Sequence, residues 1–225
     1  MTLPTKIGLG ALTVGTISGI SYAGSTYFVN NESKEKKDEQ QGTTIKALID
    51  KEYKHILLST VAGDSNTDKE HWKTAWATYQ SQNSTNEDIF KLDGWATRNN
   101  NDFTEKLKAK CGELIDTTVP DHNDTNYQNV TKYCARNVTI KDQAGKEQLK
   151  VIDTKGNDSL WTEKVQNKAN LTTHFNNLEI RASSGSEITA SDIKGGCEKA
   201  VTRNTSQDNY DNAYNSYKEV CANKG

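Results

Sequence analysis

The chain has 225 residues, enough for one large domain or two small ones. It is 33% hydrophobic and 26% charged and contains only two prolines, which is typical of a folded, polar, helix-rich protein. The net charge is −2, so the chain lacks the excess of basic residues that is typical of nucleic-acid-binding proteins, and nucleic acid is not an expected partner.

The N-terminal region contains an uncharged, largely apolar segment. Residues 7–29, IGLGALTVGTISGISYAGSTYFV, carry no charge over 23 positions, long enough to cross a bilayer as a helix. Two interpretations stay open: an uncleaved membrane anchor, or a secretory signal peptide cleaved after SYA. Both make the membrane the expected partner of this segment. In an anchor, small residues four apart would let another helix approach closely: Ala11, Gly15, Gly19 and Ala23.

Residues 30–43 are predicted to be a charged, flexible tether. Beyond it, apolar residues recur at helical spacing, so the predicted fold class is all-α from residue 44 onward. TDKE at 67–70 matches a capping box and predicts the start of one helix, and DFTE at 102–105 predicts another. A further helix is expected to begin near Asp124. The helix after TDKE carries an aromatic stripe on one face: Trp72, Trp76 and Tyr79.

The sequence repeats itself. YQNVTKYC at 127–134 returns as YNSYKEVC at 214–221, and Trp161 and Cys197 follow their first-half counterparts, Trp72 and Cys111, by 86 to 89 residues. We therefore expect two small helical units in tandem. The first spans residues 44–137, the second spans 158–225, and residues 138–157 are a linker or a short hairpin around Ala144-Gly145.

The four cysteines all follow the apolar segment. An even count in an exported chain favours disulfides, and a duplicated unit favours pairing within each copy. The predicted pairs are Cys111–Cys134 and Cys197–Cys221, each worth about 3 kcal/mol through the entropy of loop closure. Four buried free thiols are the alternative. Zinc is disfavoured because no CxxC occurs and no histidine has ligand spacing to the cysteines.

No constellation for catalysis stands out. GxSxG, HExxH, Walker and GxGxxG motifs are absent from the sequence, so no catalytic, cofactor-binding or metal site is predicted. His122 lies between Asp121 and Asp124, which could hold a metal, but a solvated turn is favoured. The aromatic stripe could stack on a sugar or a base, although three aromatics on one helix face more often form core.

HWKTAWATY, KLKAKC and YQNVTKYC, together with the Gly/Ala-rich apolar start, resemble the short exported paralogous proteins of haemotrophic mycoplasmas. The first unit matches over residues 68–136, whereas the second has Val165 and Lys168 in place of Trp and Tyr. The resemblance implies a surface-exposed protein of a wall-less bacterium, varied to evade host immunity or to bind host cells. It implies no enzyme activity.

The expected function is therefore that of an exported, surface-displayed, non-catalytic protein, antigenic or host-interacting. It would lie outside the cell, held at the membrane or secreted, because an oxidising exterior lets the cysteines pair. The alternative is an exported hydrolase that uses Asp/Glu chemistry. That alternative requires two carboxylates to converge in one pocket.

Overall fold

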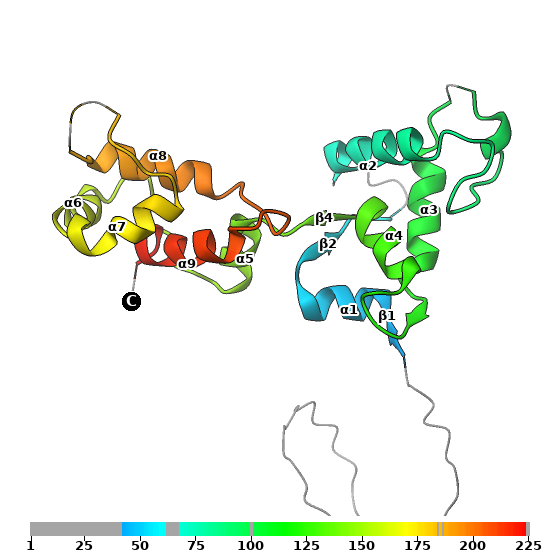
Figure 1. Ribbon diagram of the computed structural model, residues 1–225, viewed down its shortest axis with the longest axis horizontal. Helices are drawn as coiled ribbons and strands as arrows, with labels where there is room; N and C mark the ends of the chain where they lie inside the picture. The colour runs from blue at the N-terminus through cyan, green and yellow to red at the C-terminus, as the bar shows by residue number, and fades with distance from the viewer. Residues whose placement is uncertain (1–41, 62–67, 100, 184, 186, 224–225) are drawn as a thin grey trace, which may run out of the picture. The chain divides into compact units, whose positions relative to one another are not determined.

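The computed structural model describes residues 42–61, 68–99, 101–183, 185 and 187–223. This part of the chain is mostly helical, as predicted, with a few short strands (Figure 1). The predicted membrane or signal segment at 7–29, with its small-residue face, lies outside the described residues. So does the tether up to residue 41, while its last residue, Thr43, belongs to a strand.

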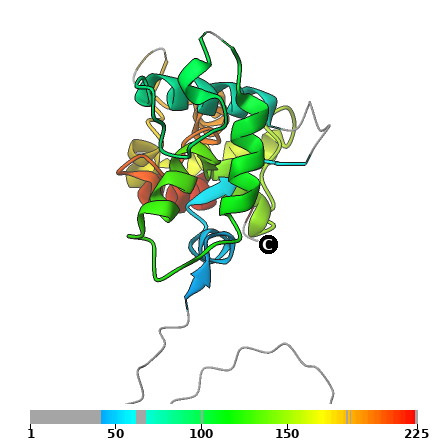
Figure 2. The same cartoon turned by 90° about the vertical axis from the view of Figure 1, so that its right-hand side faces the viewer.

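Residues 43–137, called here the first repeat, form four α-helices and two strand pairs (Figure 2 turns these helices toward the viewer). Antiparallel β1 (Thr43–Thr44) and β3 (Thr118–Val119) form one pair, and β2 (His55–Leu57) and β4 (Ala135–Asn137) form the other. A short 3-10 helix, η1, spans Trp95–Thr97. The α-helices are α1 (Ile45–Glu52), α2 (Lys69–Gln82), α3 (Thr104–Leu114) and α4 (Thr125–Tyr133).

The starts of these helices follow local hydrogen bonds. Asp124 caps α4 by accepting from Asn126 N at 2.8 Å, which confirms the predicted start. Asp102 Oδ1 accepts from Thr104 N at 2.8 Å, so the DFTE signal leads to α3, which begins at Thr104. At α2 the N-cap is Asp68, with φ 59° and no capping bond to its own helix. The proposed partner in that capping box, Thr67, lies outside the described residues.

Residues 138–223, the second repeat, contain five α-helices. They are α5 (Ile140–Lys146), α6 (Asp158–Gln166), α7 (Lys168–Asn177), α8 (Ala190–Ala200) and α9 (Tyr210–Cys221). Each repeat has its own cluster of buried side chains, one running from Ile45 to Cys134 and the other from Ile140 to Cys221.

The stretch predicted as a linker or hairpin is instead part of the second core. Ala144 and Gly145 lie inside α5, and Ile140, Ala144 and Ile152 are buried in the second cluster. The cause is a capping box: Thr139 Oγ1 accepts from Asp142 N, and Asp142 accepts from Thr139 N at 2.9 Å. This start signal outweighs the helix-breaking tendency of Gly145.

Matched residues in the two repeats make corresponding hydrogen bonds, each within its own repeat. Leu58 N donates to Cys134 O at 2.9 Å, and Ile152 N donates to Cys221 O at 2.9 Å. Trp72 Nε1 donates to Ser59 O at 2.9 Å, and Trp161 Nε1 donates to Asp153 O at 3.0 Å. Such contacts, matched in order and in partner, are what duplication of one unit predicts.

Candidate functional site

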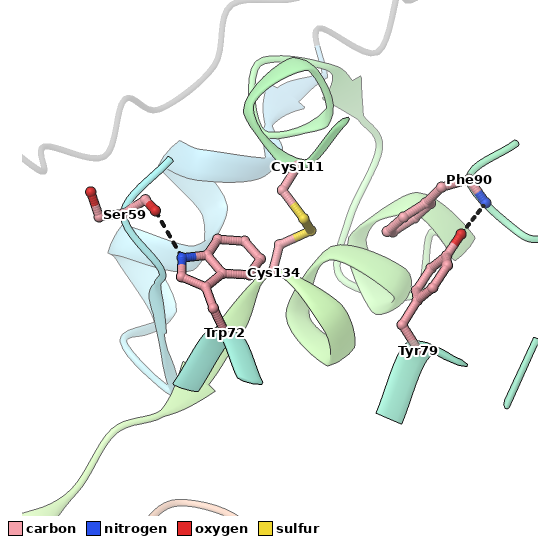
Figure 3. The surroundings of a disulfide bond; sticks show 6 residues. All are labelled: Ser59, Trp72, Tyr79, Phe90, Cys111 and Cys134. Carbon is pink, nitrogen blue, oxygen red and sulfur yellow. Dashed lines mark hydrogen bonds between the residues drawn. A yellow bond between two sulfur atoms is a disulfide. The ribbon is translucent and has the colours of Figure 1, made fainter. Parts of the chain in front are cut away.

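The four cysteines form two disulfides, and the predicted pairing is confirmed. Cys111 and Cys134 join α3 to the end of α4 with Cα atoms 5.6 Å apart (Figure 3). Cys197 and Cys221 join α8 to α9 with Cα atoms 5.8 Å apart. All four cysteines are buried, and none is free. Each bond therefore ties two helices within one repeat, as a staple copied with its unit would.

The aromatic stripe of α2 lies mostly in the core. Trp72 is 1% exposed, and its indole donates to Ser59 O beside the disulfide (Figure 3). The fully buried Tyr79 packs against Phe90 and Tyr133, with ring centroids 5.4 and 5.0 Å away. Only Trp76, at 9% exposed, keeps an edge at the surface. The expectation that the stripe forms core is therefore confirmed for all three residues, although Trp76 lies at the margin of the core.

A buried acid accompanies Tyr79. The Tyr79 hydroxyl donates to the Asp88 carboxylate. It also accepts from Phe90 N at 3.0 Å (Figure 3). Asp88 also accepts from Leu92 N at 3.0 Å. Burial, together with the bond to Asp88, raises the pKa of Tyr79. Because both Asp88 oxygens are already bonded, this pair holds the loop after α2 in place and offers no free base.

His122 lies in a turn, as expected. Its Nδ1 is 3.3 Å from Glu52 Oε1, and the Glu52 Oε2 accepts from Tyr127 at 2.8 Å. Asp121 accepts from Asn123 N, and Asp124 caps α4, so both predicted neighbours are used locally. Among the described residues, no group of three or more His, Cys, Asp or Glu side chains could hold a metal ion.

One Ser–His contact was missed by sequence reasoning, since its members lie 42 positions apart with no motif around them. Ser216 Oγ on α9 is 3.1 Å from His174 Nδ1 on α7 and accepts from Asn177 Nδ2 at 3.0 Å. Ser216 is 1% exposed, so a substrate cannot reach its hydroxyl. The contact joins two helices of the second core.

The groove between α2 and α3 combines polar and aromatic side chains. It encloses about 510 Å³ and takes side chains from one face of α2 and from the start of α3. We call it the α2–α3 groove. Its lining residues are Lys69, Trp72, Lys73, Trp76, Asp102, Thr104, Glu105 and Lys108.

Some charged side chains of this groove have a partner and others do not. Lys108 Nζ is 2.7 Å from Glu105 Oε1, and Asp102 Oδ1 accepts from Thr104. Lys69 and Lys73 make no ion pair or side-chain hydrogen bond within the described part of the chain. Two ammonium groups are thus available to a ligand.

The acids of the groove do not form a hydrolytic pair. Acid–base catalysis needs carboxylates that can converge on one substrate, whereas the Glu105 side chain is 78% exposed and bound to Lys108. Asp102 is occupied by the first turn of α3. The groove therefore fits binding better than bond cleavage.

No protein-family model, curated protein or solved structure matches this chain. In the described ranges, no helix is both long enough and apolar enough to cross a membrane.

Proposed function

We propose that this chain is an exported, surface-displayed binding protein that makes non-catalytic contact with a host cell or with host immune proteins. The observation that carries the proposal is the pairing of all four cysteines, one buried disulfide in each repeat. Disulfides form and persist outside the reducing cytosol. The uncharged segment at 7–29 supplies a means of export, as an anchor or as a cleaved signal peptide.

The chemistry of the described residues supports binding rather than catalysis. The buried Asp88 is committed to Tyr79 and Leu92, and Ser216 is closed to substrate. The resemblance to the exported paralogues of haemotrophic mycoplasmas adds that such a protein would face a host. In this proposal the disulfide-bonded repeats are a stable scaffold whose surface side chains vary between paralogues.

Protease treatment of intact cells that display the full-length chain tests the location. We expect added trypsin to cut the tether at Lys34 to Lys37 and to release the stapled repeats, while a cytoplasmic marker stays whole. Survival of the full-length protein until the cells are lysed would contradict external display.

Binding of the purified full-length chain to host cells tests the interaction. We expect saturable binding that unlabelled protein competes away and that reduction of the disulfides abolishes. Reduced and alkylated protein is the matched control, because it keeps the sequence and loses the staples. Binding that is unsaturable, or equal for both forms, would contradict a folded binding surface.

A further inference from the structure

The α2–α3 groove has an open hydrogen-bond donor on the same helix face as two free cations. Trp76 Nε1 donates to no group in the described part of the chain. It is not among the buried side-chain atoms there that lack a partner, so this N–H reaches the groove surface. Lys73 and Lys69 stand one and two turns before it on the same helix face.

The second repeat shows that these groups are not required by the fold. Counted from the matched tryptophans, Asp158 stands where the first repeat has Lys69, Thr162 where it has Lys73, and Val165 where it has Trp76. Lys194 corresponds to Lys108, counted from the matched cysteines.

In the second repeat the corresponding charges neutralise each other. Lys194 Nζ lies 2.7 Å from Asp158 Oδ1. The same helix pair is therefore built without the free cations and without the indole. Of the two repeats, only the first has this groove chemistry.

We propose that the α2–α3 groove binds an acidic sugar, a ring with one carboxylate and several hydroxyls. The carboxylate would pair with Lys69 and Lys73, and the Trp76 N–H would donate to a ring or hydroxyl oxygen. Asp102 and Glu105 each keep one carboxylate oxygen that is not bonded to Thr104 or Lys108, and these oxygens can accept from sugar hydroxyls. The inference rests on the proposed function and names the class of ligand that this surface takes.

The charge pattern favours one negative charge over many. A polyanion such as a nucleic acid would bring further phosphates against Asp102 and Glu105, where like charges repel. A neutral sugar would leave the two ammonium groups unpaired. The volume of about 510 Å³ lies within the range of small-molecule sites.

Isothermal titration of the full-length chain in detergent with 3′-sialyllactose tests the proposal, with lactose as the uncharged comparison. We expect at least a roughly tenfold preference for the acidic sugar, which weakens as salt is added. The double variant K69Q/K73Q should weaken binding by about tenfold or more. The control K150Q/K155Q removes the same charge from exposed lysines of the second repeat and should bind as the original does.

The conservative variant W76F separates the indole donor from its ring. It keeps an aromatic side chain against Trp95 and Phe103 and should lower affinity a few-fold, with an unchanged far-UV circular dichroism spectrum. If K150Q/K155Q weakened sialyllactose binding as much as K69Q/K73Q does, the groove proposal would fail, because the sugar would then be held by general charge attraction. Absence of sialyllactose binding at millimolar concentration would overturn it outright.

The host-cell assay distinguishes failure of this inference from failure of the proposed function. If K69Q/K73Q binds cells as the original does, the groove proposal fails and the binding function stands. If neither protein binds cells, but the original binds sialyllactose and K69Q/K73Q binds it at least roughly tenfold more weakly, the function fails and the groove stands.

Discussion

The Tyr127 hydroxyl donates to Glu52 Oε2 at 2.8 Å, joining α4 to the end of α1. Tyr214 and Glu147 hold the corresponding places in the second repeat, each as part of the same sequence pattern. Burial and the nearby Glu147 raise the pKa of Tyr214. Its buried hydroxyl nevertheless has no partner of hydrogen-bond geometry among the described residues. The Tyr127–Glu52 contact thus has hydrogen-bond geometry, whereas the Tyr214–Glu147 contact falls outside it.

We therefore expect the two Tyr→Phe changes to differ. Y127F removes a bond to a carboxylate and should lower the free energy of unfolding by about 1 kcal/mol. Y214F removes an unpartnered buried hydroxyl and should change it by less than about 0.5 kcal/mol or raise it. Urea denaturation of both proteins measures the difference, and equal losses would contradict the assignment of partners.

Removal of a disulfide should destabilise the chain through its unfolded state. The double variant C111S/C134S should lower the free energy of unfolding by about 3 kcal/mol, because the bond closes a loop of 23 residues. Peptide mapping without reduction should still find Cys197 joined to Cys221. An unchanged melting temperature would show that the bond contributes nothing.

Two neighbouring glycines in α8 should respond in opposite directions to alanine. A Cβ at Gly196 would overlap the Ile180 side chain, so G196A should cost about 1–3 kcal/mol. A Cβ at Gly195 meets nothing within 4 Å, so G195A should stabilise by about 0.5–1 kcal/mol through helix propensity. Thermal unfolding of both variants measures the two effects. A lower melting temperature in both would contradict the open space beside Gly195.

Stability should fall in acid through Asp142. Burial alone would raise its pKa, but bonds from Arg136 at 2.6 and 3.0 Å and from Thr139 outweigh burial and hold the pKa below its usual range. A lowered native pKa stabilises the fold above the unfolded value of about 4, and this contribution is lost as pH falls below it.

The variant D142N isolates this contribution. It should lower the free energy of unfolding by about 2 kcal/mol at neutral pH and flatten the acid branch of the stability profile. The control D50N changes an exposed aspartate on α1 and should leave that branch as it is. An acid branch as steep in D142N as in the original chain would assign the effect to other groups.

The sequence alone predicts the helical class, the repeat and both disulfides. Periodic apolar residues and matched cysteines carry this information because each copy must build the same core. Thr44-Ile45-Lys46 returns as Thr139-Ile140-Lys141, and each triplet leads into a helix. That match predicts the helix α5, although the Ala144-Gly145 pair within it favours a turn.

The groove is harder to predict. Trp76 shares the helical period of Trp72 and Tyr79, and periodicity places all three on the core side. Whether an edge stays open depends on where α3 starts, and that is set by tertiary packing. Alignment of the two repeats nevertheless shows, from the sequence alone, that Asp158 takes the place of Lys69.

The staple between Cys111 and Cys134 changes what a single cut does to the first repeat. The segment between them includes an exposed turn at residues 121–123. A nick there would leave two polypeptides still covalently joined, migrating as one species on a gel until a reductant parts them. The folded surface of the repeat would thus persist after a protease had broken its backbone, and an intact band would be no proof of an intact chain.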